Sequence, residues 1–251
     1  MANETSAAPK IIAPAAPPPK ITIVIPIYNE EPILQSAVIE LIDRLDGFPW
    51  TYELVLAENG SRDKTVEMAQ KLAERFPQVK TFSFGQPNYG GALKRGILEA
   101  RGEFVLCDEI DLCDTDFHKR ALEELESGRA DFVVGSKAMR GASDERPFIR
   151  RVGTHAVNGM LRVTLGFTGT DTHGLKAFRR SVVKPIAERC IVDRDMFASE
   201  LVIRAEREGV RMKEIPVRVL EKRVPTIGLA RRVPNVLKAV GRLVWAIRIQ
   251  G

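Results

Sequence analysis

The sequence predicts an α/β protein with a mainly parallel sheet, helices on both faces of that sheet, and an amphipathic helix at the C-terminus. The first observation behind this prediction is that short apolar runs alternate with segments of helical spacing from residue 21 to residue 137. The second is composition, because 44% hydrophobic and 28% charged residues are ordinary for a globular protein. The third is length, since 251 residues can build one large domain or two small ones with a substantial core.

The expected elements follow one another regularly in the first half of the chain. The run ITIVIPI at 21–27 is continuously apolar and rich in β-branched residues, as buried parallel strands are. Residues 30–45 have helical spacing, and Pro32 is acceptable in a first helical turn. The same alternation predicts strands at 51–57, 79–84, 103–107 and 130–137, and helices at 63–76, 90–100 and 116–128. After about residue 145 the pattern becomes less regular.

The N-terminal segment differs from this middle part. Residues 1–20, MANETSAAPKIIAPAAPPPK, are rich in Ala and Pro, so they are expected to form a disordered tail, and they lack the pattern of a signal peptide. Residues 21–232 are expected to form the folded domain and residues 233–251 the C-terminal helix. Cys107, Cys113 and Cys190 fit neither a disulfide framework nor a zinc-site spacing, which favours reduced thiols in a cytosolic protein.

The C-terminal helix is expected to lie flat on a membrane surface. Its apolar residues recur at helical spacing: Val236, Leu237, Val240, Leu243, Val244 and Ile247. No apolar run within it approaches the roughly 18 residues that a spanning helix needs, because basic residues interrupt it. From Lys222 to the end, seven residues are basic and none is acidic, which indicates an anionic partner such as a membrane surface or a phosphate. A nucleic-acid partner is disfavoured because aromatic residues do not interleave with the basic ones. The alternative is a helix docked on the protein's own core.

Polar clusters follow three of the expected strands. YNEE follows the first strand, ENGSRD the second, and the acidic group Asp108, Glu109, Asp111 and Asp114 the fourth. Ligands of open parallel sheets bind outside the carboxyl ends of the strands, so three such clusters indicate a site. The NYGG segment before the helix at 90–100 fits a phosphate cradle or simply a helix cap. Like charges as close as those of the acidic group repel one another unless they are solvated or held by a cation.

Six segments resemble the family-2 glycosyltransferases in order and spacing. They are ITIVIPIYNEE, VLAENGSRDKT, NYGGALKRGILEARGEFVLCDEIDLCD, DFVVGSK, GTDTHGLKAF and ASELVIRAEREGVRMKEIPVRVLEKR. Within that family the chain looks most like the polyprenyl-phosphate (dolichyl-phosphate) mannose and glucose synthases. The resemblance implies a GT-A (Rossmann-like) fold, a nucleotide-sugar donor, a polyprenyl-phosphate acceptor and a divalent cation, Mg²⁺ or Mn²⁺. It also implies a peripheral position on the cytosolic face of a membrane.

The resemblance further implies donor-side roles. The residues that would line the nucleotide base pocket are Pro26, Tyr28, Asn29 and Glu30. The residues of the turn that would contact base or ribose are Glu58, Gly60, Ser61 and Asp63, and Glu58 stands where the family usually has Asp. Asn88, Gly90 and Lys94 match the next donor segment. Lys137 replaces the usual Arg, which keeps the charge but loses the bidentate fork.

The acidic group lies where the family carries Asp-x-Asp, and in that register the chain has Glu109-Ile110-Asp111. Glu109 and Asp111 are therefore the expected metal ligands and catalytic residues, since Mg²⁺ commonly takes one or two carboxylates beside substrate phosphates. Strand alternation would place 109 and 111 on one face and Asp108 on the other. The longer Glu109 keeps open the alternative of a decayed site that binds nucleotide-sugar as a membrane-bound partner without catalysis.

On the acceptor side, Arg150 and Thr154 resemble a phosphate-binding pair, and Arg223 a late basic residue closing on the phosphates. A lipid phosphate, with a second pKa of roughly 6, attacks the anomeric carbon without a general base and inverts it. A saccharide or other hydroxyl acceptor would need a base, for which Asp171 or Glu200 are candidates, each with an ordinary structural role as the alternative. His118 and His155 are expected in helices without a metal role, and His173 could line the acceptor loop.

Overall fold

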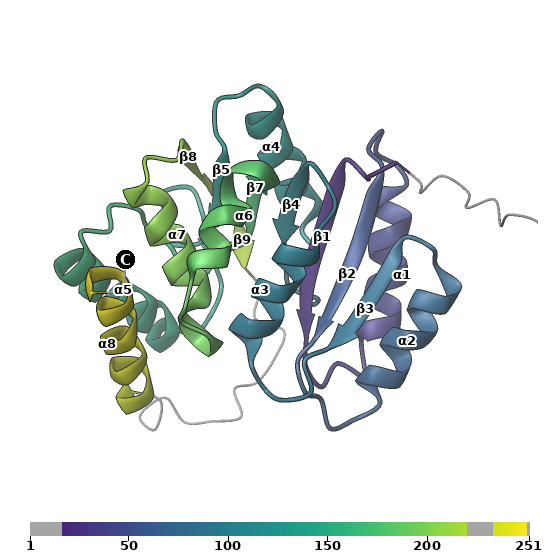
Figure 1. Ribbon diagram of the computed structural model, residues 1–251, viewed down its shortest axis with the longest axis horizontal. Helices are drawn as coiled ribbons and strands as arrows, with labels where there is room; N and C mark the ends of the chain where they lie inside the picture. Colours follow the sequence, from purple (N-terminus) through teal and green to yellow (C-terminus); the bar gives the residue numbers. More distant parts are fainter. Residues whose placement is uncertain (1–16, 220–232, 250–251) are drawn as a thin grey trace, which may run out of the picture.

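The computed structural model describes residues 17–219 and 233–249 (Figure 1). Its main sheet has seven strands in the order β3-β2-β1-β4-β7-β5-β8. The strands are β1 (Ile21–Ile27), β2 (Tyr52–Glu58), β3 (Val79–Ser83), β4 (Phe104–Cys107), β5 (Phe132–Ser136), β7 (Lys176–Arg179) and β8 (Met212–Pro216). All neighbours pair in parallel except β7, which lies antiparallel between β4 and β5. A second sheet pairs β6 (Ser143–Asp144) with β9 (Arg218–Val219).

Helices cover both faces of the main sheet. They are α1 (Leu34–Leu45), α2 (Thr65–Arg75), α3 (Tyr89–Glu99), α4 (Thr115–Glu126), α5 (Phe148–Leu165), α6 (Arg180–Arg189), α7 (Phe197–Arg207) and α8 (Val233–Ile249), with a 3₁₀ turn, η1 (Arg194–Met196), before α7. Side chains alternate along the strands, so Ile23 and Ile25 face a core shared with α1, α2 and α4. Val24 faces the opposite core, which α3, α5, α6, α7 and α8 share. The result is a three-layer α/β/α sandwich.

The predicted α/β class with a mainly parallel sheet and a C-terminal helix is confirmed. The elements expected before residue 137 are all present, and β1 has the predicted bounds. The helix expected from residue 30 begins at Leu34, because residues 31–33 form a turn first. The irregular second half contains α5, α6, α7 and the two strands β7 and β8, which the alternation of apolar residues did not reveal.

The C-terminal helix packs differently from the expectation. Val240, Leu243 and Ile247, three residues of the stripe expected to face lipid, are at most 6% exposed and belong to the core beside α3, α5 and α7. Arg204 of α7 also donates from Nη2 to the carbonyl of Ala246 at 3.2 Å. Three of the six residues of the stripe are therefore buried in protein, as in the docked alternative, whereas Leu237 is exposed. Within residues 17–219 and 233–249, no helix combines the length and apolar character needed to cross a bilayer.

The expected tail reaches the described part of the chain only at its end. The backbone N–H of Lys20 donates to Thr51, and its ammonium group pairs with Glu103 at 3.0 Å. Residues 1–16 lie outside the described residues, as do 220–232. The three cysteines are buried free thiols, as expected of reduced side chains.

Candidate active site

The polar clusters predicted at strand ends meet at one edge of the sheet. The parallel strands β1, β2 and β4 run in the same direction side by side, so their carboxyl ends lie together (Figure 1). Tyr28 follows β1, Asn59 follows β2 and Asp108 follows β4. This edge is where open α/β sheets bind ligands.

The turns after β1 and β2 are hydrogen-bonded to each other. The backbone N–H of Asn29 donates to Ser61 Oγ at 3.0 Å, and Asn29 Oδ1 accepts from the N–H of Arg62 at 2.8 Å. Asn29 has a φ of 54° and Gly60 one of 79°. At Gly60 an added Cβ would also lie 2.4 Å from the backbone carbon of Gln86, so glycine is required there. Tyr28 is left 37% exposed above these turns.

Glu58 and Asp63 shape this region from within. The Glu58 carboxylate is 1% exposed and accepts from the N–H of Ser61 and the hydroxyl of Ser83. Burial alone would raise the pKa of Asp63, but hydrogen bonds from Thr65 and Glu31 outweigh it and hold that pKa below its usual value. Pro26 is buried within β1, and the N–H of Glu30 donates to Thr65 at 2.7 Å. These predicted donor residues thus come together, several of them as supports for the turn.

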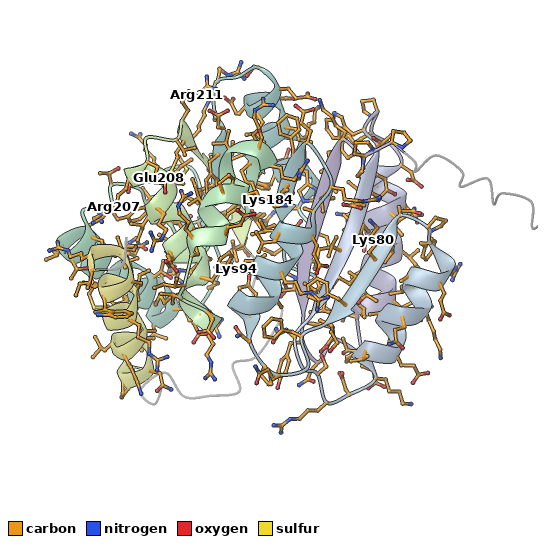
Figure 2. The ribbon with its side chains drawn as sticks, in the orientation of Figure 1. Lys80, Lys94, Lys184, Arg207, Glu208 and Arg211 are labelled. Atoms are coloured by element: carbon orange, nitrogen blue, oxygen red, sulfur yellow. The ribbon has the colours of Figure 1, made fainter. Side chains whose placement is uncertain are left out.

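Asn88 joins α3 to the loop before α7. Its Oδ1 accepts from the N–H groups of Gly91 and Arg194 at 2.8 and 2.9 Å, so it caps α3 and holds η1 at once. An added Cβ at Gly90 would lie 2.3 Å from the carbonyl oxygen of Arg194, which explains the glycine. Lys94 donates to the carbonyl of Cys190 at 2.5 Å, at the end of α6 (Figure 2). NYGG therefore acts here as a helix cap and a close contact, and Lys94 as a support.

Asp108 organises the acidic turn without facing the site. Its side chain is buried and accepts from the N–H groups of Glu109 at 2.7 Å and Asp114 at 3.0 Å. His118 Nε2 lies 2.7 Å from the same carboxylate, and both side chains are 1% exposed. Strand alternation is the wrong reason for separating Asp108 from Glu109, because β4 ends at Cys107 and the acids lie in the following turn. The hydrogen bonds of Asp108 separate them instead.

Glu109 is exposed and Asp111 is half-buried, as is Asp114, whose Oδ1 accepts from the N–H of Phe117 and so caps α4. Part of the Glu109 side chain is exposed at the surface, but protein groups surround it. They desolvate its carboxylate, and this desolvation, followed by the charge of Asp111, raises its pKa. Asp111 also lines a hollow of about 280 Å³ between the turn and α1. Tyr89 is 38% exposed, yet desolvation by surrounding protein groups, followed by the charge of Glu109, raises its pKa. A bound cation would relieve the repulsion between two such carboxylates.

Two lysines face these acids from the other side. Lys137 Nζ pairs with Asp171 at 2.7 Å, and both side chains are largely buried. Burial, the largest single influence, tends to raise the pKa of Asp171, but the charge and hydrogen bond of Lys137, together with the N–H of His173, outweigh it and lower that pKa. Lys176 is 3% exposed, donates to the carbonyl of Gly174, and has a pKa lowered by burial. Lys176 was not expected from the sequence, because it lies in the unrecognised strand β7.

A cavity of about 610 Å³ opens between α5 and α8. Thr154 lines it, as expected for an acceptor residue, and so do Lys137, Arg146 and His173. Arg146, which sequence reasoning missed, is held by Asp144 at 2.7 Å and donates to Thr154 Oγ1 at 3.2 Å. His173 is exposed toward solvent, yet desolvation by the protein groups around it, followed by the charge of Lys137, lowers its pKa to about 4, so its imidazole is neutral at pH 7.

The remaining candidates are placed less centrally. Glu200 is fully buried and accepts from the N–H groups of Ile191 and Val192 and from Arg204, which is a structural role. Arg150 lies one helical turn before Thr154, whose hydroxyl donates to its carbonyl. His118 and His155 lie in helices, as expected. Arg223 lies outside the described residues.

The residues present fit a divalent cation that shares its ligands with a substrate. Among the residues that the structure describes, no three His, Cys, Asp or Glu side chains gather as a complete protein metal site. Glu109 and Asp111 supply two carboxylates instead, as Mg²⁺ sites completed by water and phosphate oxygens do.

Solved structures show the same fold. Glucosyl-3-phosphoglycerate synthase from Mycobacterium tuberculosis, solved with Mn²⁺, UDP-glucose and glycerol 3-phosphate, superposes with a TM-score of 0.62 at 18% identity, over 91% of this chain and 80% of that one. A second mycobacterial protein gives a TM-score of 0.64 at 22% identity, over 91% and 74% of the two chains. The expected GT-A fold is thereby confirmed.

Sequence relatives point the same way. Glycosyltransferase AglD of Haloferax volcanii is 28% identical over 92% of this chain and 38% of its own length. A dolichyl-phosphate beta-glucosyltransferase of Trichomonas vaginalis is 30% identical over 78% of this chain and 64% of its own, and that of Drosophila melanogaster is 29% identical over 82% and 68%. The chain thus spans only part of these relatives. Residues 22–186 match the family described as Glycosyl transferase family 2, and the chain belongs to that family.

Proposed function

We propose that this chain transfers a hexose, mannose or glucose, from a nucleotide-sugar to a polyprenyl phosphate, with inversion at the anomeric carbon and with Mg²⁺ or Mn²⁺ as cofactor. Relatives named as dolichyl-phosphate beta-glucosyltransferases support the acceptor class. A relative named undecaprenyl-phosphate 4-deoxy-4-formamido-L-arabinose transferase, 28% identical over 80% of this chain, also supports it. The complex of a structural neighbour with Mn²⁺ and UDP-glucose supports the donor class and the metal.

The observation that carries the proposal is that Asp171 and Glu200, the two carboxylates that the sequence suggested as a base, are both held by other protein groups. Asp171 is paired with Lys137, and Glu200 is buried against Arg204 and two backbone N–H groups. An alcohol acceptor needs a base to remove its proton, whereas a phosphate near neutral pH is already anionic and nucleophilic. The arrangement therefore favours a phosphate acceptor.

The donor side is assigned to the turns at the sheet edge. Tyr28 and the Asn29–Ser61 turn would hold the nucleoside, with Glu58 and Asp63 keeping that turn in place. Glu109 and Asp111 would hold the divalent cation, which neutralises the departing diphosphate when bound. The decayed-site alternative is less favoured, since the longer Glu109 still offers an exposed carboxylate close enough to Asp111 to interact with its charge.

The acceptor side is assigned to the cavity between α5 and α8. Arg146, Lys137 and Thr154 line it and would bind the acceptor phosphate. Arg150 lies one turn before Thr154 on α5, and Arg223 is proposed to close on the phosphates. The neutral imidazole of His173 would border the same space. The protein is proposed to be peripheral on the cytosolic face of a membrane, where such an acceptor resides, and a membrane protein is proposed as a partner.

Turnover with defined acceptors tests the proposal. The purified protein would be incubated with UDP-glucose or GDP-mannose and either a short-chain polyprenyl phosphate or the matching alcohol, with Mn²⁺ or with EDTA. We expect product only with the phosphate and the metal, and NMR should show an anomeric configuration opposite to that of the donor. Product with the alcohol alone, or retention of configuration, would contradict the proposal.

Asp195 separates phosphate and hydroxyl acceptors further. It also lines the cavity, so it would be the remaining base for a hydroxyl acceptor. Asp195→Asn is expected to leave turnover of the phosphate acceptor within about threefold of wild type, since no proton has to be removed. A loss of about 100-fold or more, in the range of general-base catalysis, would instead favour the hydroxyl alternative.

A further inference from the structure

The outward face of α5 is apolar. Phe148 is 73% exposed, Ile149 58%, Val152 47% and Val163 86%. At about 100° per residue these four side chains fall within one face of the helix. The opposite face carries the buried residues Asn158, Leu161 and Leu165. We call these four exposed residues the α5 outer face.

Single exposed apolar residues are normal in proteins, whereas their accumulation on one surface marks an interaction site. Among the described residues, ten large hydrophobic side chains are exposed, and seven of them lie on α5 or α8. These two helices pack against each other at the end of the molecule farthest from β3 (Figure 1). The exposed apolar surface is therefore concentrated at that end.

Charge indicates what covers this face. The exposed charged residues of α5 are Arg151 and Arg162, and neither α5 nor α8 contains an acid. A second copy related by a two-fold axis would bring the arginines of one α5 against those of the other, which is repulsive. An anionic lipid surface offers both the acyl boundary for the apolar side chains and negative headgroups for the arginines.

We propose that the α5 outer face is the surface by which the protein docks on an anionic lipid bilayer. This docking surface rests on the proposed function, because it would bring a lipid acceptor to the cavity. Thr154, on the same helix, lines that cavity. α5 thus lies between the bilayer and the space assigned to the acceptor phosphate. The phosphate of a lipid acceptor would then have only α5 to pass to reach Arg146 and Thr154, while its chain stays in the bilayer.

Flotation of the full-length protein with vesicles tests this docking. Vesicles of phosphatidylcholine alone would be compared with vesicles that also contain phosphatidylglycerol, at low and high salt. We expect wild type to float with the anionic vesicles at low salt. The double variant Ile149→Glu/Val152→Glu should lower the vesicle partition coefficient by about tenfold or more, because it replaces membrane-buried apolar groups with repelled charges. The matched control is Ile191→Glu, at a side chain 49% exposed outside α5, which should float as wild type does.

Each other outcome overturns the docking surface. It is wrong if wild type stays in solution at low salt, if the double variant floats unchanged, or if Ile191→Glu lowers flotation as much. A wild-type dimer in size-exclusion chromatography that the double variant dissociates would assign the face to a second copy instead. Turnover of a water-soluble short-chain polyprenyl phosphate by wild type is measured separately. If wild type turns it over but does not bind vesicles, only the docking surface is disproved. If wild type binds vesicles but does not turn it over, only the proposed function is disproved.

Discussion

The two halves of the site are built in different ways. In the donor half, polar groups are held by hydrogen bonds between turns that directly follow neighbouring strands, as in the Asn29–Ser61 pair. In the acceptor half, groups from distant parts of the chain are held by buried ion pairs, such as Lys137 with Asp171, and by the packing of α8. Substitutions in the donor half should therefore have local effects on ligand binding. Substitutions in the acceptor half should spread to the stability of the whole domain.

The largest expected effect sharpens this contrast on the donor side. Glu109→Gln and Asp111→Asn should each lower the metal-dependent affinity for a nucleotide-sugar by more than about 100-fold, because a cation bound by few carboxylates contributes several kcal/mol. Unfolding stability without metal should stay the same or rise, since either change removes the repulsion that raises the pKa of Glu109. Calorimetric titration with and without Mn²⁺ and thermal unfolding measure the two properties.

The matched control for these variants is Asp116→Asn, an acid of the first turn of α4 that pairs with Arg120 at the surface. It should bind the nucleotide-sugar as wild type does. Unchanged metal-dependent binding in both the Glu109 and the Asp111 variants would remove these residues from the metal site.

The next effect tests the acceptor half through α8. Leu243 is fully buried and Leu237 is 53% exposed on the same helix. Leu243→Ala should cost about 2–5 kcal/mol of unfolding free energy, as large-to-small core substitutions do, whereas Leu237→Ala should stay within about 0.5 kcal/mol. Urea unfolding of the two variants measures the difference. Equal and small effects would mean that α8 is not part of the core, as the sequence-based expectation of a lipid-facing stripe had it.

The strands and turns of the proposed donor half could be located from the sequence because their signals are local. A buried strand followed by a polar turn is readable without tertiary information, so β1, the ENGS turn with Gly60 and the acidic turn could all be located. The acceptor half could not be derived in this way. β7 is a four-residue strand whose place between β4 and β5 is set by tertiary pairing, and Arg146 belongs to no periodic element.

The C-terminal helix shows a second limit. An apolar stripe at helical spacing fits a core and a lipid surface equally, and only the packing against α5 and α7 distinguishes them. The engagement of Asp171 and Glu200 is likewise invisible in sequence, since their partners Lys137 and Arg204 are identified as such only in the folded chain.

Asp108 lies in the donor half, but buried hydrogen bonds and a buried pairing with His118 hold it, as in the acceptor half. A substitution there should therefore affect both stability and donor binding. Asp108→Asn replaces one acceptor oxygen with a donor facing buried N–H groups, and it should cost about 1–3 kcal/mol of unfolding free energy. Metal-dependent donor affinity should fall only about tenfold, because the turn loosens while both proposed ligands remain. Thermal unfolding and the same calorimetric titration measure the two effects.

His118 distinguishes support from ligation at this position. His118→Leu removes the partner of Asp108 without touching the proposed metal ligands, so it should reproduce the stability loss of Asp108→Asn. A loss of metal affinity in Asp108→Asn as severe as in Asp111→Asn, with His118→Leu harmless, would make Asp108 a ligand and move the register of the acidic turn.

The smallest effect is expected at the N-terminus, which belongs to neither half. Deleting residues 1–16 should leave the melting temperature and donor binding unchanged, because an Ala- and Pro-rich segment buries too little apolar surface to contribute to the core. Deleting residues 1–20 removes Lys20 as well, whose ammonium group pairs with Glu103 and Glu126 on partly exposed side chains. Such pairs contribute roughly 0–1 kcal/mol each, so the longer deletion should lower the melting temperature by only a few degrees. A larger fall with the shorter deletion than with Leu243→Ala would mean that the first sixteen residues stabilise the domain more than a core leucine does, and the domain boundary expected at residue 21 would then be wrong.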